Sequence, residues 1–97
     1  MHNEESDLTI DIYGHKRYKN KAGKLHRIDG PAVEMGGYKV WYHCGARHRI
    51  DGPAVYDGEV KQFYLRGQYF ETKEAFFEAL TPEEKEIAIF SEDFHNA

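Results

Sequence analysis

Short apolar stretches alternate with glycine-containing turns through the middle of the chain. Residues 39–43 and 61–65 are rich in aromatic and branched side chains, which favour β-strands. Gly36-Gly37 and Asp57-Gly58 are dipeptides that supply the positive φ of tight hairpin turns. Residues 31–34 begin a strand, because proline tolerates the first position of a strand. The pattern therefore predicts antiparallel β-hairpins.

Alternation along these strands assigns side chains to the two faces of the predicted sheet. Trp41 and Phe63 occupy corresponding positions on one face. We expect this face to be the better buried one, with both aromatic rings against C-terminal helices. The expected helix contacts are Phe76, Leu80 or Ile87.

The periodicity changes after residue 71. Thr72 precedes a segment whose apolar residues follow helical spacing. Thr81, Pro82 and Glu84 then form the start signal of another helix, with the residues of a capping box. One or two short helices are predicted within residues 72–94, where they cover one face of the sheet and its last edge.

An internal repeat organises the chain. The octapeptide His-Arg-Ile-Asp-Gly-Pro-Ala-Val occurs at residues 26–33 and again at residues 48–55, an offset of 22 residues. Glycines at the same offset extend the pattern to a degenerate front unit. There Lys19 is expected in the place of Trp41. The pattern stops downstream, where the histidine and arginine of the octapeptide are missing.

Together these patterns predict a single domain over residues 1–97 of mainly β (α+β) class. Its core is an antiparallel sheet of tandem 22-residue β-hairpin repeats over residues 10–70. One or two short C-terminal helices follow within residues 72–94. Residues 1–9 are polar and are expected to be a frayed N-terminus.

The repeated sequence resembles a known repeat. Gly-x-Leu-His-Arg-x-Asp-Gly-Pro-Ala-Val, followed by a turn and x-Trp-Tyr-x-x-Gly, is similar to the MORN-like repeat variant of small bacteriophage and antitoxin-like bacterial proteins. Residues 23–33 with 39–45, and residues 45–55 with 61–67, match it in turn. The resemblance implies a stackable hairpin scaffold in a phage accessory protein with a binding role. It does not imply a particular partner, and the partner that we expect is a host protein, such as a defence factor.

Composition narrows the class of protein. The 97 residues suit one domain, and no run approaches the roughly 18 apolar residues that a membrane span needs. No secretion signal follows Met1. The single cysteine, Cys44, cannot form an intrachain disulfide. The expected compartment is therefore cytoplasmic, and the host bacterial cytoplasm if a phage encodes the protein.

The net charge of -4 conceals an uneven distribution. Residues 10–70 carry eleven Lys and Arg against six acids, whereas residues 71–97 carry two Lys against eight acids. One interpretation is that the acidic tail folds back and partly neutralises the middle. The other is that the basic, aromatic middle binds an anionic partner.

The His-Arg-x-Asp sequence is the strongest candidate for chemistry. A metal site would use its two histidines and two aspartates, but Asp-Gly-Pro turns already account for the aspartates. We expect no metal, no cofactor and no catalytic residue, and Cys44 beside a turn glycine is not expected to be a nucleophile. A structural turn role is predicted for Asp29, Gly30, Pro31, Asp51, Gly52 and Pro53.

The predicted function is non-enzymatic protein binding. A sheet that buries one face on helices leaves its other face and its turn edge free, and tyrosine and arginine are enriched at binding hot spots. The candidate binding residues are His26, Arg27, Tyr42, His48, Arg49 and Tyr64. One alternative is nucleic-acid or nucleotide binding through the same basic aromatic face. In the other, the tyrosines only cover the sheet and the arginines only pair with aspartates.

Overall fold

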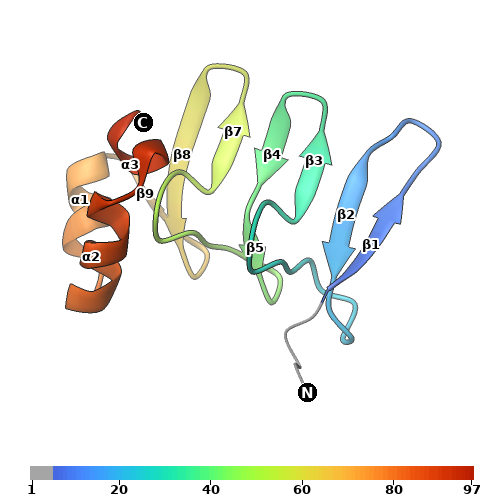
Figure 1. The fold of residues 1–97 in the computed structure, drawn as a ribbon, viewed down its shortest axis with the longest axis horizontal. Coiled ribbons are helices and arrows are strands. Elements are labelled where there is room, and N and C mark those ends of the chain that lie inside the picture. Colours follow the sequence, from blue (N-terminus) through green and yellow to red (C-terminus); the bar gives the residue numbers. More distant parts are fainter. Residues whose placement is uncertain (1–5) are drawn as a thin grey trace.

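The fold is a row of β-hairpins closed at one end by helices (Figure 1). The computed structural model describes residues 6–97. Seven strands form one antiparallel sheet in the order β1-β2-β3-β4-β7-β8-β9, and β5 pairs with β6. The strands are β1 Asp7–Ile10, β2 Lys16–Lys19, β3 Val33–Met35, β4 Tyr38–Val40, β5 Tyr42–His43, β6 Ala46–Arg47, β7 Val55–Asp57, β8 Val60–Leu65 and β9 Gln68–Phe70. The helices are α1 Lys73–Glu78, α2 Pro82–Ile89 and α3 Glu92–His95. The predicted fold class is confirmed.

Two-residue turns join β3 to β4 and β7 to β8. The first is Gly36-Gly37, as predicted. In the second, Asp57 pairs with Val60, so the turn is Gly58-Glu59 and lies one residue later than predicted. Gly58 has a φ of 63°, which residues with a side chain rarely adopt.

A second set of tight turns lies at the opposite end of the hairpins (Figure 1). Cys44-Gly45 joins β5 to β6, and Arg66-Gly67 joins β8 to β9. Cys44 and Arg66 both have a φ of 50°, and the glycines that follow them also have positive φ. Two left-handed residues in succession match the twist of the strands that they connect.

Between its last strand and the first histidine of the octapeptide, the front unit is one residue longer than the unit that follows it. The backbone of Tyr18 makes the same hydrogen bonds as that of Trp41: its amide donates to an alanine carbonyl, and its carbonyl accepts from a histidine amide. Tyr18, and not Lys19, therefore takes the place of Trp41. The extra residue lies in the turn at residues 20–24, outside the strands, where it does not disturb the sheet.

Two hydrophobic clusters stabilise the fold. The first joins strand β8 to all three helices through Phe63, Leu65, Phe76, Leu80, Ala88 and Phe94. The second lies in the middle of the sheet and consists of Val33, Val40 and Val55, with partly buried neighbours that include Tyr42 and Tyr64. The helices therefore contact the last repeat, and aliphatic packing holds the middle.

Trp41 lies outside both clusters, so the prediction that it is buried with Phe63 against the helices is wrong. The ring centroid of Phe63 lies 4.7 Å from that of Phe76. Trp41 is half-buried and lies under the guanidinium of Arg49 instead. In this repeat the better-buried face carries Val40.

The first two helices start at the predicted signals. Thr72 accepts a hydrogen bond from the amide of Ala75, and Thr81 and Glu84 form a reciprocal capping box. A third helix of one turn, α3, follows, where one or two helices were predicted.

The sheet begins earlier in the chain than predicted. All four residues of β1 pair with β2, so residues 7–9 belong to the sheet and not to a frayed segment. Ser6 is partly buried and its hydroxyl donates to the carbonyl of His26, so it is not frayed either. The rest of that prediction falls on residues 1–5, which lie outside the described residues.

Candidate binding groove between the repeated loops

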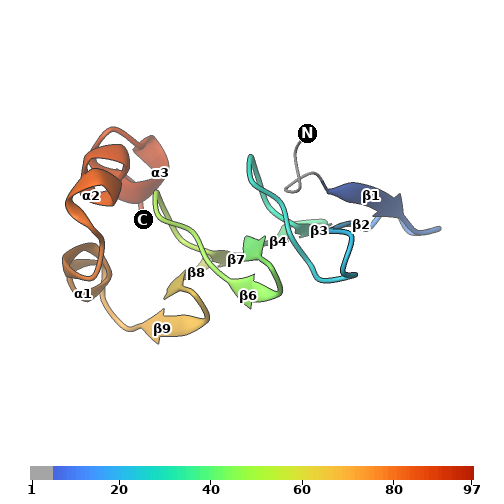
Figure 2. The ribbon, with the colours of Figure 1, turned by 90° about the horizontal axis from the view of Figure 1, so that it is seen from below.

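The two octapeptides form loops on the same side of the sheet (Figure 2). We call residues 26–31 loop 1 and residues 48–53 loop 2. In each loop the arginine Nε donates to the aspartate two residues later, at 3.0 Å in loop 1 and 2.9 Å in loop 2. Its Nη1 donates to the proline carbonyl, at 3.2 Å and 3.1 Å. The identical sequences therefore make the same contacts, as predicted.

Each arginine lies between an aromatic ring and a glycine. The Cζ atom of Arg27 lies 4.1 Å from the ring centroid of Tyr18, and that of Arg49 lies 4.0 Å from the ring centroid of Trp41. A Cβ atom on the glycine of either loop would come within 2.9 Å of this Cζ. The glycine of Asp-Gly-Pro is thus favoured by the close approach of the guanidinium, which a side chain here would displace, and not by a left-handed φ.

The histidine of each loop binds the tight turn of the following hairpin. Nδ1 of His26 accepts from the amide of Cys44 at 2.9 Å, and Nδ1 of His48 accepts from the amide of Arg66 at 3.0 Å. His26 is only 1% exposed. The side chain of this candidate binding residue is therefore buried, and its hydrogen bond connects one repeat to the next.

Between the loops the surface forms a groove of about 800 Å³. Its lining comes from three parts of the chain. These are the two loops (residues 27–31 and 48–51), the strand segment of residues 41–43, and the helical end with Glu84, Ile87 and Asp93. Four candidate binding residues, Arg27, Tyr42, His48 and Arg49, lie in this lining. Sequence reasoning missed the contribution of the helical end, for which the repeat pattern holds no signal.

The two loops differ in what covers them. Ser91 Oγ donates to the carbonyl of Asp51 at 2.7 Å, and Asp93 Oδ2 accepts from Nη2 of Arg49 at 2.6 Å. Loop 2 accordingly lies beside α3, whereas loop 1 stands apart from the helices (Figure 2). The aspartate side chain is 85% exposed in loop 1 and 41% exposed in loop 2.

Both groove arginines are ion-paired within the chain. Arg27 pairs with Asp29 and with Glu34, at 3.0 Å and 3.3 Å. Arg49 is largely buried and pairs with two aspartates, one from loop 2 and one from α3. Burial disfavours its charge, but hydrogen bonds to these carboxylates outweigh that effect and raise the pKa of Arg49. Its positive charge therefore stabilises the fold through these two ion pairs.

The surroundings of His48 favour the neutral form of its imidazole. Burial lowers the pKa of its imidazole, and the positive charge of Arg66 lowers it further. A neutral ring agrees with the role of Nδ1 as an acceptor.

Tyr64 lies outside the groove lining and already has a partner. Its hydroxyl accepts from Nη1 of Arg47 at 3.1 Å, and the Arg47 Cζ atom lies 5.2 Å from the ring centroid. Hydrogen bonding to Tyr42 and to Tyr64 raises the pKa of Arg47. The face on which the tyrosines were expected to be free is therefore partly covered by strand β6 of the same chain.

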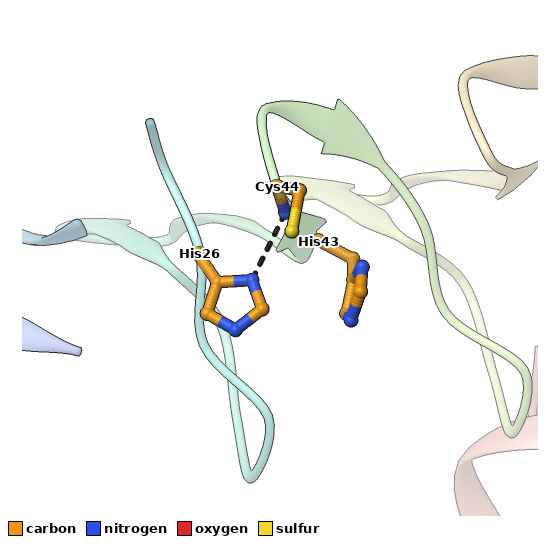
Figure 3. Close-up of side chains that lie close together, drawn as sticks. All are labelled: His26, His43 and Cys44. Atoms are coloured by element: carbon orange, nitrogen blue, oxygen red, sulfur yellow. Dashed lines mark hydrogen bonds between the residues drawn. The ribbon is translucent and has the colours of Figure 1, made fainter. Parts of the chain in front are cut away.

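Three groups that can bind transition metals lie together next to the groove. One ligand atom from each of His26, His43 and Cys44 lies within 4.8 Å of the others (Figure 3). The Nδ1 lone pair of His26, however, already accepts from the Cys44 amide, as the dashed line in Figure 3 shows. His48 makes the same bond in the next repeat, so we assign His26 a structural role. That the fold needs no metal stays a prediction.

Among residues 6–97, no helix is both long and apolar enough to cross a membrane. No protein-family model matches the chain, and no curated protein or solved structure is similar to it. The resemblance to the MORN-like repeat variant therefore rests on the repeated residues themselves.

Proposed function

We propose that the protein is a non-enzymatic protein-binding module that holds its partner in the groove between loop 1 and loop 2. The observation that carries the proposal is an open groove between two loops, each of which is stabilised by its own hydrogen bonds and ion pair. In each loop an arginine ties the aspartate to the proline carbonyl and lies against an aromatic ring. Such loops lose little conformational freedom when a partner binds, which favours affinity.

The groove offers apolar contacts as well as polar ones. Ile28 of loop 1 is 63% exposed, and Ile87 of α2 is also exposed. Both line the groove together with the half-buried Trp41. Apolar anchors surrounded by polar groups are typical of protein interfaces, so the groove suits side chains of a protein segment.

Nucleic-acid binding, the alternative, has less support. It was predicted from the basic, aromatic face of the sheet, and the two repeated arginines at the edge of that face are both balanced by carboxylates. The groove lining also contains the acidic residues Asp29, Asp51, Glu84 and Asp93, which repel phosphates.

The resemblance to the MORN-like repeat variant adds a biological role to the proposal. It supports a bacteriophage accessory protein that docks on, or inhibits, a host protein such as a defence factor in the bacterial cytoplasm.

The proposal can be tested by capturing partners from a bacterial lysate at low and at high salt. Ile28→Asp places a charge in the groove, and Val60→Asp is a matched control, because Val60 is also exposed, at 53%, and lies outside the groove lining. We expect a protein partner that binds the wild type and Val60→Asp at high salt but not Ile28→Asp. Capture of nucleic acid that weakens steeply as salt rises would favour the alternative.

A further inference from the structure

The C-terminal segment of the chain contacts loop 2 and provides a template for a ligand of loop 1. We infer that loop 1 binds an acidic Ser-x-Asp segment of a partner protein, with the chemistry of the chain's own Ser91-Glu92-Asp93. This inference rests on the proposed protein-binding function and adds the chemical class of the partner.

The template is the contact of this segment with loop 2. The carboxylate of Asp93 accepts from Nη2 of Arg49 at 2.6 Å, and the hydroxyl of Ser91 donates to the carbonyl of Asp51 at 2.7 Å. The segment also packs closely, since a Cβ atom on Gly52 would lie 3.1 Å from Cβ of Asp93. One carboxylate, one hydroxyl and one close backbone contact thus define the ligand of loop 2.

Loop 1 presents the same groups. Nε and Nη1 of Arg27 bond to Asp29 and to the carbonyl of Pro31, as in loop 2. Within residues 6–97, no hydrogen bond is made by Nη2 of Arg27 or by the carbonyl of Asp29. The equivalent groups in loop 2, Nη2 of Arg49 and the carbonyl of Asp51, bind Asp93 and Ser91.

The surface around these groups is open in loop 1 and covered in loop 2. Asp29 and Ile28 are highly exposed, whereas the equivalent Ile50 packs against the helical cluster. Gly30 and its neighbouring proline are likewise partly exposed, and their equivalents in loop 2 are buried. The same sequence therefore has a ligand in one copy and a free binding surface in the other.

The charge around loop 1 accommodates a further carboxylate. Glu34 already lies 3.3 Å from Arg27, but Lys16 and Lys39 are its direct cross-strand partners on either side. Directly opposite residues project from the same face of a sheet and interact there. With Arg27 the two lysines make three positive charges against the two negative charges of Asp29 and Glu34, so the surroundings of loop 1 can attract an acidic ligand.

The ligand is a different protein and not a second copy of this chain. The Ser-x-Asp segment of each copy is already held by its own loop 2 through both contacts. A second copy would have to release that segment before it could bind loop 1 elsewhere.

A labelled peptide with the sequence of residues 88–97 tests the inference with the full chain as receptor. Fluorescence polarisation should show saturable binding with a Kd on the order of 1 mM or tighter. Asp93→Asn in the peptide, or Arg27→Gln in the protein, should weaken binding at least tenfold, and Val60→Asp should leave it unchanged. Amide NMR signals of residues 27–31 should shift during the titration.

Three results would overturn the inference: no saturation at several millimolar peptide, signal changes confined to residues 49–53, or self-association of the chain that Arg27→Gln abolishes. The peptide variant keeps the test valid if Arg27→Gln does not fold, because it leaves the protein unchanged. If the lysate partner is still lost with Ile28→Asp while the peptide does not bind, the protein-binding function stands and only the ligand chemistry is wrong.

Discussion

The same strand position has different neighbours at the end of the sheet and in its middle. At the helical end, Phe63 lies under the ring of Phe76, with centroids 4.7 Å apart. In the middle, Trp41 lies under the guanidinium of Arg49, 4.0 Å from its Cζ atom. The residue 22 positions beyond that arginine is Glu71, so the third repeat has no arginine to cover its aromatic ring.

This difference shows how the repeat array ends. A repeat covers the aromatic residue of the unit before it with a polar, ion-paired loop, and the helices cover the last one with an apolar side chain. Terminal units that differ from internal ones are typical of repeat proteins, because each internal unit is stabilised only by its neighbours. Stability is therefore concentrated at the capped end, and loop 1, which the C-terminal segment does not cover, is free to bind.

Removing the apolar cover should have the largest effect. Phe76 is fully buried, so Phe76→Ala should lower the free energy of unfolding by about 3–5 kcal/mol. Trp41→Ala, at a half-buried position, should cost less, about 2 kcal/mol. Urea unfolding of the two variants measures both values. Equal losses would mean that the middle of the sheet depends on its aromatic residue as strongly as the capped end does.

Removing the two arginines should distinguish the covered loop from the open one. Arg49→Ala removes a buried guanidinium that lies against Trp41 and pairs with two partly exposed aspartates, and it should cost about 2 kcal/mol. Arg27 is more exposed, so Arg27→Ala should cost about 1 kcal/mol. The comparison is made by chemical unfolding, and a larger cost at Arg27 would contradict the assignment of loop 1 as the binding copy.

Releasing the C-terminal segment should make loop 2 resemble loop 1. Asp93→Asn removes one carboxylate from a partly exposed ion pair and should cost about 1 kcal/mol. Amide hydrogen exchange in residues 49–53 should rise toward the rate in residues 27–31, while exchange in β8 should stay slow. Unchanged exchange in loop 2 would show that other contacts hold it.

The smallest expected effect is a pH dependence from His48. Because its pKa is lowered in the folded chain, the unfolded chain binds more protons as the pH falls below about 6.5. Stability should therefore decrease as the pH falls through that region. In His48→Asn, whose amide oxygen can still accept from Arg66, this part of the decrease should disappear from melting curves recorded across the same pH range. An equal decrease in the variant would assign it to other groups.

The hairpins and the first two helix starts could be predicted because they depend on local signals, such as Gly36-Gly37 and the capping residues Thr81 and Glu84. The correspondence between Tyr18 and Trp41 was missed because a fixed offset of 22 residues fails where a turn gains one residue. Trp41 was misplaced because alternation assigns a residue to a face but does not determine how far the helices extend over it.

The site was only partly predictable for the same reason. The pairing of Arg27 with Asp29, and of Arg49 with Asp51, follows from their spacing within the octapeptide. The contact of Asp93 with Arg49 joins residues 44 positions apart and depends on how the helices pack. Two identical octapeptides therefore have different roles, which the repeat alone does not reveal.

The pairing between units also has an evolutionary consequence. Strand β2 pairs with β3 as β4 pairs with β7, with a lysine opposite residue 34 in one case and residue 56 in the other. A duplicated unit inserted between two neighbouring units would therefore find the same kind of strand edge to pair with on each side. The helical cap would stay in place. Each duplication would add one more open loop, so that the number of binding loops, and with it the avidity for a repetitive or multivalent partner, can change without redesign of the fold.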